Sequence, residues 1–146
     1  RTLIDIRSST INCNINLFKE VDKCYIWGNE NRIAQVFDNL IQNASSFSNY
    51  NCRIDIRLEK KSKKIIILVE DNGPGFSKFG LSKIFNRFYT ERPKTEKFGN
   101  HSGLGLSISK QILDAHGGTI EAFNRLNKKN KCVGATVKTS FNKFVL

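Results

Sequence analysis

The sequence predicts an α/β fold in which helices cover one face of a mixed sheet, and three patterns support this prediction. Residues 53–58 alternate apolar and polar side chains, as a half-buried strand does, and residues 64–70 carry a continuous apolar run that suits a central strand. Apolar residues recur at helical spacing before this pair, over residues 33–44, and after it, over residues 106–115. Strands and helices mixed in this order are typical of a two-layer α/β sandwich.

The first helix is predicted to follow an extended segment over residues 17–27 that ends in a turn at Gly28. Asn29 or Asn31 can cap this helix, because a short amide side chain accepts a hydrogen bond from the free backbone amides of the first turn. One face of the helix is apolar, since its apolar residues lie three or four positions apart: Ile33, Val36, Phe37, Leu40, Ile41 and Ala44.

The middle of the chain differs in composition, because residues 71–105 hold six glycines and both prolines. A brief helix is expected over residues 81–88. Residues 89–102 show no periodic pattern, and a long segment without structure inside a compact domain is usually a functional lid.

The last part of the chain is predicted to contain the second long helix and a final hairpin. Gly117 can end the helix over residues 106–115 by adopting a left-handed conformation. Residues 119–123 and 135–141 then resemble two paired strands.

The length of 146 residues fits a single domain with its own hydrophobic core, and residues 1–6 are expected to be the start of an excised fragment, not a signal peptide. The net charge of +11 is compatible with nucleic acid, an anionic membrane surface or a phosphate ligand. The lysines concentrate in residues 60–64 and 128–131, each between strand-like segments and without interleaved aromatic residues. Solvated hairpin tips are therefore the favoured interpretation.

The four cysteines are Cys13, Cys24, Cys52 and Cys132. They are far apart in the sequence, and neither a CxxC pair nor a Cys/His cluster has the spacing of a metal site. Free thiols in a reducing cytoplasm are therefore expected.

Asn39 and Asn43 are the first candidate functional residues. They lie four positions apart, on one face of the first predicted helix, beside its apolar stripe. An asparagine oxygen can complete the octahedral shell of a magnesium ion that holds nucleotide phosphates. The alternative is a solvated helix edge, which this pair alone does not exclude.

The second candidate is Asp71, which begins the sequence DNGPG directly after the predicted central strand. A carboxylate at the end of a strand can accept a hydrogen bond from an adenine amino group, and Gly73 and Gly75 let the backbone approach the base. The alternative is a simple hairpin turn, which the following Pro-Gly and the absence of a returning strand disfavour.

The third candidate is the glycine-rich sequence GLGL over residues 103–106, at the start of the last predicted helix. Backbone amides at such a helix start suit a phosphate group. Two glycines that end a loop are the alternative. The sequence is not a Walker motif, because no GK[ST] follows, and a Rossmann fingerprint would lie directly after a strand.

These elements together resemble a known family. NLIQNA, VEDNGPGF, KIFNRFY and SGLGLSI follow one another as the N, G1, F and G2 boxes do in the histidine-kinase branch of the GHKL ATPases, and AHGG at residues 115–118 also matches. The resemblance covers nearly the whole chain and implies the Bergerat form of the α/β sandwich. The lid sequences FYTERP and FGNHS further resemble acid- or envelope-sensing kinases of the ChvG/ExoS type.

The resemblance implies a role for each matching residue. Asn43 would bind magnesium, with Asn39 beside it, directly or through water, and Asp71 would bind the adenine amino group. Phe47 would pack on the adenine, and Phe85 and Phe88 would anchor the base of the lid. Gly73, Gly75, Gly103 and Gly105 would bracket the nucleotide, and the remaining predicted nucleotide contacts are His101, Ser102, Leu104 and Leu106.

Two positions depart from the family pattern. Many relatives carry lysine where this chain has Ser46, and arginine where it has Thr90, and both would contact phosphates. Arg87, Arg92 or His101 could substitute for them. His101 lies in the predicted lid and His116 precedes a helix stop, so neither is expected to accept a phosphoryl group.

The resemblance therefore implies a protein-histidine kinase domain that binds ATP and Mg²⁺ and phosphorylates a histidine on a separate dimerisation domain. Further expected partners are a response regulator but no nucleic acid, and the parent protein would be a membrane-anchored homodimer with this domain in the cytoplasm. One alternative is an ATP-hydrolysing relative, which would need a glutamate in place of Asn39 to activate water. The others are a degenerate signalling module that binds only nucleotide or a partner domain, and a basic nucleic-acid-binding module.

Overall fold

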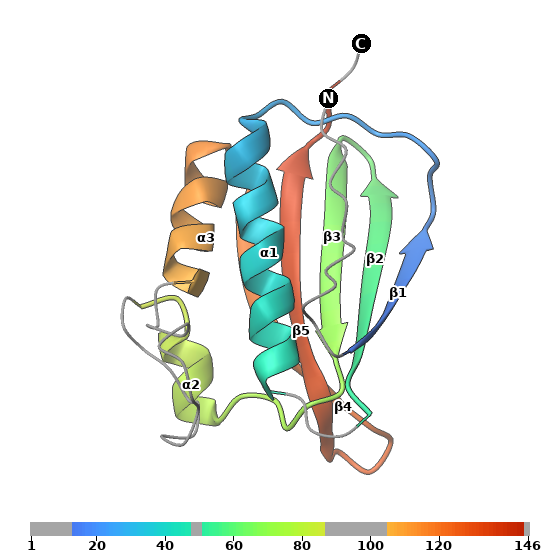
Figure 1. Ribbon diagram of the computed structural model, residues 1–146, viewed down its shortest axis with the longest axis vertical. Coiled ribbons are helices and arrows are strands. Elements are labelled where there is room, and N and C mark those ends of the chain that lie inside the picture. Colours follow the sequence, from blue (N-terminus) through green and yellow to red (C-terminus); the bar gives the residue numbers. More distant parts are fainter. Residues whose placement is uncertain (1–12, 48–50, 87–104, 145–146) are drawn as a thin grey trace.

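The computed structural model describes residues 13–47, 51–86 and 105–144, and it has the predicted two-layer α/β architecture (Figure 1). Within these ranges five strands form one sheet in the order β1-β2-β3-β5-β4. β1 pairs with β2 in parallel and the other pairs are antiparallel, so the sheet is mixed. The elements are β1 (Asn14–Lys19), α1 (Glu30–Phe47), β2 (Arg53–Lys61), β3 (Lys64–Asp71), α2 (Lys78–Lys83), α3 (Gly105–Ala115), β4 (Thr119–Leu126) and β5 (Cys132–Asn142).

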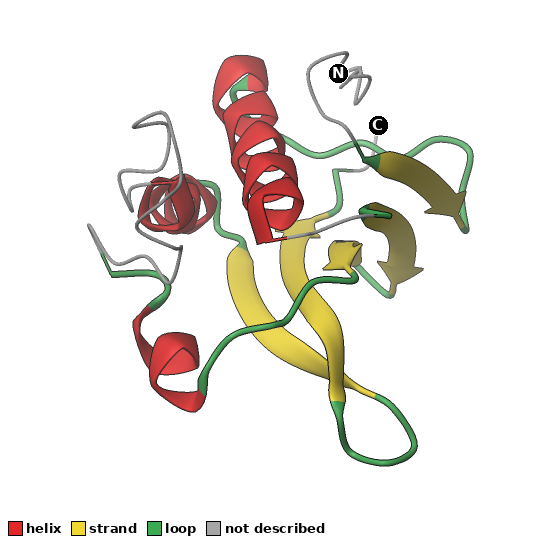
Figure 2. Cartoon of the chain, turned by 60° about the horizontal axis from the view of Figure 1, so that its bottom comes forward, coloured by secondary structure: helices red, strands yellow, loops and turns green. Residues whose placement is uncertain are grey.

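The two long helices, α1 and α3, lie on the same face of the sheet (Figures 1 and 2). Asn29 caps α1, because its Oδ1 accepts a hydrogen bond from the Arg32 amide at 3.1 Å, whereas Asn31 lies inside the helix. All six residues of the predicted apolar stripe of α1 are buried, which confirms that this stripe faces the core. Removal of each large aliphatic side chain from water contributes about 1.5–3 kcal/mol to folding.

Both lysine-rich tracts form exposed hairpin tips, as predicted. The β2–β3 hairpin turns between Lys61 and Lys64, and Ser62 there adopts a φ of 55°. The β4–β5 turn is held by Asn127, whose Oδ1 accepts hydrogen bonds from the amides of Lys129 and Lys131 at 2.8 and 3.1 Å.

The end of α3 at Ala115 and the start of β4 at Thr119 agree with the sequence prediction. Gly117 adopts a φ of +69° after α3, which is the left-handed stop expected there. The Gly118 amide then donates to the Leu113 carbonyl at 2.8 Å, and the chain turns into β4.

The strands predicted over residues 53–58, 119–123 and 135–141 are longer in the structure, and two other predicted elements differ more. The extended segment over residues 17–27 is a strand only as far as Lys19, and its last backbone hydrogen bond to β2 runs from the Glu20 amide to the Leu58 carbonyl at 3.0 Å. It returns to the sheet through an isolated bridge between Ile26 and Lys143. The short helix α2 begins at Lys78, before the predicted residue 81, because Ser77 caps it by accepting a hydrogen bond from the Gly80 amide at 2.8 Å. The predicted lid over residues 89–102 lies outside the described residues.

The prediction of free thiols is wrong for two of the four cysteines. Cys13 and Cys52 form a disulfide, with their Cα atoms 4.7 Å apart. The parallel ladder aligns Asn14 with Arg53, so the preceding residues, Cys13 and Cys52, also face each other. Cys24 and Cys132 are free.

Among the described residues, no helix has both the length and the apolar character needed to cross a lipid bilayer.

Candidate functional site

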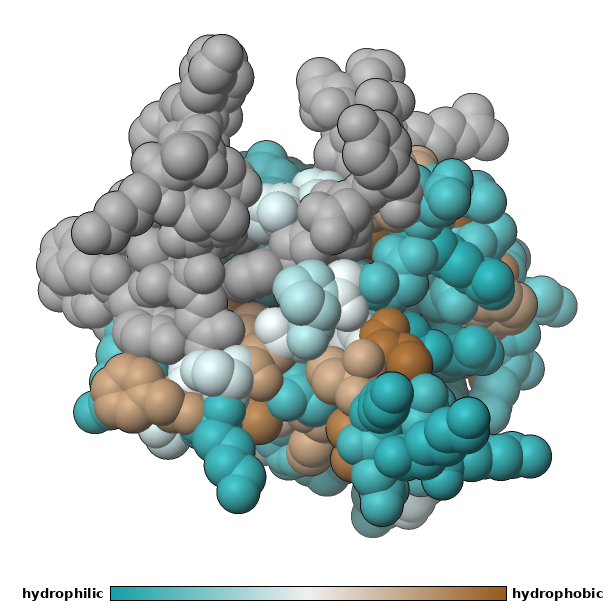
Figure 3. Space-filling view, turned by 90° about the horizontal axis from the view of Figure 1, so that it is seen from below, coloured by the Kyte–Doolittle hydropathy of each residue, from teal (hydrophilic) through white to brown (hydrophobic). Residues whose placement is uncertain are grey.

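The described residues of the predicted site lie toward one end of the sheet, where β3 ends, α1 ends and α3 begins (Figure 1). The lysine-rich tip of the β2–β3 hairpin lies at the opposite end. Figure 3 looks onto the site end, where apolar and weakly polar residues occupy the centre and hydrophilic side chains gather along one side. Residues far apart in the sequence thus converge on one surface.

Asp71 is the last residue of β3 and is 5% exposed. Its Oδ1 accepts hydrogen bonds from the amides of Gly73 at 2.9 Å and Ala135 at 3.1 Å. Since both bonds end on Oδ1, Oδ2 is the oxygen that can accept a further donor. Burial raises the pKa of this carboxyl, while the two amides and the charge of Arg125 oppose the rise. A buried, oriented acceptor of this kind suits a donor such as an exocyclic amino group.

Arg125 and Gly134 also shape the surroundings of Asp71, and the sequence analysis did not identify either residue. Arg125 lies opposite Gly134 in the β4–β5 ladder, and its Nη1 donates to the Asp71 carbonyl at 2.8 Å. Its Nε lies 3.7 Å from a carboxylate oxygen of Glu70. A Cβ on Gly134 would lie 1.9 Å from the Asp71 carbonyl oxygen, so only glycine lets the strands approach this closely. No local pattern in the sequence reports such a contact.

The turn after β3 is held by a second pair of long-range contacts. The side-chain amide of Asn124 bonds both the amide and the carbonyl of Phe76, each at 2.7 Å. Gly75 has a φ of +79°, and a Cβ there would lie 2.4 Å from the Cys132 sulfur. The glycine predicted to let the backbone pass close is thus required by both conformation and space.

Asn39 connects α1 to the start of α3. Its Nδ2 donates to the Gly105 carbonyl at 3.2 Å and to the Ser109 hydroxyl at 3.4 Å. These two acceptors fix the orientation of the amide, so Oδ1 is the atom available as a ligand. Ser109, which is fully buried, also donates to the Gly105 carbonyl at 2.9 Å. The structure therefore brings together Asn39 and Gly105, which are 66 positions apart.

Asn43 lies one helical turn beyond Asn39 and is half-buried. Its carbonyl accepts a hydrogen bond from the Ser46 hydroxyl at 2.8 Å, so Ser46 serves the helix end at the position where many relatives carry lysine. Among the described residues, no group of three or more His, Cys, Asp or Glu side chains could hold a metal ion. The asparagine oxygens fit magnesium that is held chiefly by phosphate oxygens and water.

The remaining predicted contacts divide into described and undescribed residues. Leu106 and Phe85 are half-buried and pack against both hydrophobic clusters, one of which consists of Phe76, Ile84 and Ala135 next to Asp71. The other predicted contacts, Phe88, His101, Ser102, Gly103 and Leu104, lie outside the described residues, as do Arg87, Thr90, Arg92 and the side chain of Phe47.

His116 makes packing contacts between two helices. Its Nε2 accepts a hydrogen bond from the Asn29 amide at 3.1 Å, and its Nδ1 lies 2.7 Å from the Ile112 carbonyl. The ring therefore carries its proton on Nδ1 and joins the end of α3 to the start of α1.

Comparison with known proteins agrees with this geometry. A family described as "Histidine kinase-, DNA gyrase B-, and HSP90-like ATPase" matches residues 28–143. The chain is 51% identical over 109 residues to the sensor protein ChvG of Rhizobium meliloti (strain 1021), and 50% identical over 109 residues to that of Agrobacterium fabrum (strain C58). These matches cover 74% of this chain but only 19% and 18% of the two relatives, so the chain spans about a fifth of their length.

Solved structures give the same assignment of the fold. The nucleotide-free catalytic domain of the histidine kinase ThkA superimposes with a TM-score of 0.75 at 30% identity, covering 90% of this chain and 80% of that domain. A structure of ThkA in complex with the response regulator TrrA matches with a TM-score of 0.72 at 28% identity, covering 91% of this chain and 35% of that one.

Proposed function

This chain belongs to the histidine kinase-, DNA gyrase B- and HSP90-like ATPase family, and from that premise we propose that it binds Mg-ATP and transfers the γ-phosphate to a histidine on a separate domain. The single observation that supports this best is the Asn39–Gly105 contact, because it joins the two elements predicted to contact the phosphates, α1 and the start of α3. The similarity to the catalytic domain of the histidine kinase ThkA favours a histidine as the acceptor.

Asp71 would select the base. Its Oδ2 accepts a hydrogen bond from the adenine amino group, while Oδ1 stays bonded to the amides of Gly73 and Ala135. Guanine presents a carbonyl oxygen at the corresponding position, which a carboxylate repels. Base selectivity thus follows from an acceptor that is oriented before the nucleotide arrives.

Asn43 and Asn39 would hold the metal and phosphate side. Asn43 supplies an oxygen ligand to Mg²⁺, and Asn39, whose Nδ2 is committed to Gly105 and Ser109, directs its oxygen to the metal or to its water. The metal offsets charge on the transferred phosphoryl group when it is bound. The amides at the Gly105 end of α3 add donors for the phosphates.

The phosphoryl acceptor would be supplied by another domain. Phosphoryl transfer depends on a nucleophile in line with the γ-phosphate, and both nitrogens of His116 are engaged in packing contacts. Asn39 has no carboxylate with which to activate water, which disfavours ATP hydrolysis as the main activity. A dimerisation domain of the same kinase and a downstream response regulator are the proposed partners, in a membrane-anchored homodimer with this domain on the cytoplasmic side.

Calorimetric titration of the chain with ATP, with and without Mg²⁺, tests the first half of this proposal. We expect saturable binding that strengthens with magnesium and a marked preference for ATP over GTP. Binding of neither nucleotide would favour the alternative of a degenerate module that contacts only a partner domain.

A further inference from the structure

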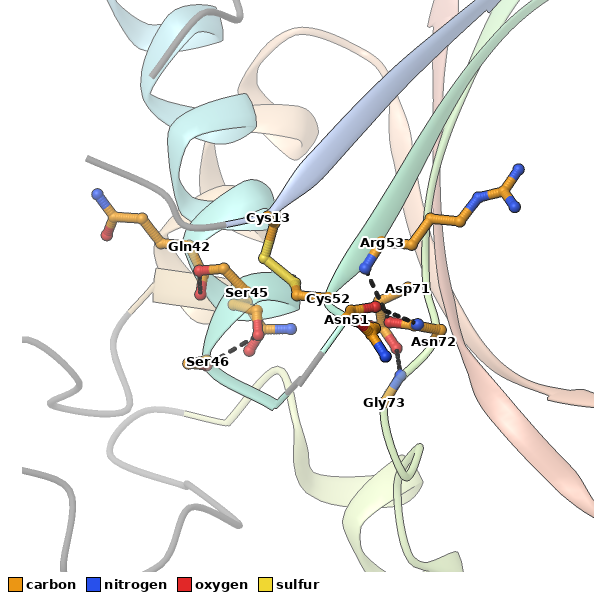
Figure 4. The surroundings of a disulfide bond; sticks show 11 residues. Cys13, Gln42, Ser45, Ser46, Asn51, Cys52, Arg53, Asp71, Asn72 and Gly73 are labelled. Atoms are coloured by element: carbon orange, nitrogen blue, oxygen red, sulfur yellow. Dashed lines mark hydrogen bonds between the residues drawn. A yellow bond between two sulfur atoms is a disulfide. The ribbon is translucent and has the colours of Figure 1, made fainter. Parts of the chain in front are cut away.

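The Cys13–Cys52 disulfide lies at the edge of the candidate nucleotide site, among residues of the last turns of α1 and of the turn after β3 (Figure 4). Cys52 is 8% exposed and belongs to the main hydrophobic cluster, whereas Cys13 is half-buried. The bond connects the start of β1 to the residue just before β2. It is therefore close to the elements that bear Asn43 and Asp71.

Asn72 connects this disulfide to the adenine side of the site. Its Oδ1 accepts a hydrogen bond from the Arg53 amide at 3.0 Å, and its Nδ2 donates to the Asn51 carbonyl at 2.9 Å. The Asn72 side chain thus bonds the backbone on either side of Cys52, and Asn72 directly follows Asp71 (Figure 4). The disulfide that restrains Cys52 is therefore connected, through the side chain of Asn72, to Asp71, the residue proposed to recognise the base.

The fold around the pair does not depend on the covalent bond alone. The Asn14 amide donates to the Cys52 carbonyl at 2.9 Å, and the β1–β2 ladder continues from there to Leu58. Asn51, however, lies before the ladder, which begins at Arg53 on this strand, and adopts a φ of 59°, a turn conformation that asparagine tolerates. Loss of the disulfide should therefore loosen residues 51–53 while the sheet stays paired.

We propose that Cys13 and Cys52 are a reversible thiol–disulfide site that regulates nucleotide affinity. When the pair is oxidised, the two Asn72 side-chain hydrogen bonds are held and the adenine side keeps its binding geometry. When the pair is reduced, residues 51–53 loosen and this geometry is lost. This inference rests on the proposed function, because it concerns the regulation of that same nucleotide site.

The chemistry is an exchange with a low-molecular-weight thiol such as glutathione. A thiolate attacks the more accessible sulfur, that of Cys13, and forms a mixed disulfide while the Cys52 sulfur leaves with the electron pair and takes up a proton. A second thiolate then attacks the reagent sulfur of this mixed disulfide, which releases the Cys13 thiol and one molecule of the reagent's disulfide. Two reagent thiols supply the two electrons, and the reverse sequence re-forms the bond.

The test measures the Mg-ATP dissociation constant of the chain in buffers of increasing glutathione-to-glutathione-disulfide ratio. Rapid alkylation and peptide mass analysis report the oxidised fraction of Cys13–Cys52 in the same samples. Affinity should follow that fraction, and full reduction should weaken binding at least about fivefold, at the lower end of typical coupling between sites.

Cys13→Ser and Cys24→Ser provide matched variants. Cys13→Ser removes the bond at its outer sulfur and should bind with the affinity of the reduced protein in every buffer. Cys24 is a free thiol on the segment between β1 and α1, so Cys24→Ser should retain the full redox response.

Four results would overturn the inference. Equal ATP affinity in the oxidised and reduced protein would do so while leaving the proposed function intact, and so would failure of the pair to oxidise under glutathione disulfide. A redox response that persists in Cys13→Ser would assign the effect to other thiols. Absence of ATP binding in both redox states would remove the proposed function, and this inference with it.

Discussion

The adenine side and the metal side of the site are built in different ways. Asp71 is buried and is held by main-chain amides from its own turn and from β5. Asn39 and Asn43 are half-buried on a helix, and the described bonds of the Asn39 side chain go to α3. The residue proposed to recognise the base is therefore fixed by the sheet, whereas the proposed metal ligands depend on how two helices meet. The following substitutions test this difference.

The largest effect on binding is expected from Asn43→Ala, on the metal side. Loss of an outer partner of a metal site costs about 10- to 100-fold in affinity, and loss of a direct ligand should cost more. The variant should bind ATP equally weakly with and without Mg²⁺. Its thermal unfolding should change little, since Asn43 is not among the buried residues of the core.

Calorimetry with ATP, in parallel with thermal unfolding, separates this effect from misfolding. Unchanged magnesium-dependent affinity in a folded Asn43→Ala protein would disprove the metal assignment.

Asp71→Asn should have the next largest effect, and only on adenine nucleotides. A hydrogen bond to a charged group is worth about 1.5–3 kcal/mol, so ATP affinity should fall by roughly one to two orders of magnitude. If the oxygen of the new amide keeps the contacts with Gly73 and Ala135, its NH₂ group faces the base and suits the guanine carbonyl. GTP affinity should then stay equal or rise. Equal losses for both nucleotides would mean that Asp71 is structural.

The raised pKa of Asp71 gives this comparison a pH dependence. Burial of the charged form means that the folded protein holds this proton to a higher pH than the unfolded chain does. The stabilisation of the folded protein by the protonated Asp71 carboxyl is fully present below the ordinary aspartate pKa of about 3.9. It is lost as the pH rises through the higher pKa that Asp71 has in the folded protein. ATP affinity changes with pH in the opposite direction, and rises as the pH rises, because only the ionised carboxylate is a pure acceptor. The wild-type advantage over Asp71→Asn should therefore shrink as pH falls through the raised pKa, as paired titrations would show.

Arg125→Gln should have a smaller effect, because Arg125 acts through Asp71. Removal of one hydrogen bond to the Asp71 carbonyl costs about 0.5–1.5 kcal/mol, so ATP should bind roughly two- to tenfold more weakly. Lys110→Gln removes the same charge from the exposed face of α3, where Lys110 pairs with Asp114, and serves as the control. If the two variants lose ATP affinity equally, the effect is one of net charge and not of position.

His116→Ala is expected to have the smallest effect on the site. It removes the contacts with Asn29 and Ile112 and should lower the free energy of unfolding by about 1 kcal/mol for each hydrogen bond lost. ATP affinity should be unchanged, because His116 lies at the opposite end of α3 from Gly105. Denaturant titration and calorimetry on the same preparation would check both outcomes.

The periodic parts of the fold could be predicted from the sequence because they are local. The apolar stripe of α1, the two hairpins and the stop at Gly117 each follow from neighbouring residues. The ordered motifs also identified the family. They singled out Asn39 and Gly105, which the structure brings into contact, whereas the roles of Asn39, Asp71 and Gly105 in one nucleotide site stay a prediction. The boundary of α2 was missed because its Ser77 cap carries a weak signal.

Contacts between distant residues could not be predicted in this way. The Cys13–Cys52 bond spans 39 positions and depends on the β1–β2 register, which no local pattern in the sequence reveals. Arg125 reaches Asp71 only because Gly134 leaves space between the strands. The lid prediction over residues 89–102 stays a prediction, and limited proteolysis with and without Mg-ATP would test it: ATP should protect this segment from cleavage.

Transfer of label from [γ-³²P]ATP tests directly whether this chain phosphorylates a histidine on another domain. The chain is incubated with Mg-ATP alone, and then with an added histidine-bearing dimerisation domain from a ChvG-type sensor kinase. We predict no label on this chain and little release of phosphate when it is alone, because Asn39 cannot activate water. We predict acid-labile label on the added domain, at a rate that rises with its concentration because no tether joins the two. Rapid phosphate release by the chain alone, or label on His101 or His116, would contradict the account.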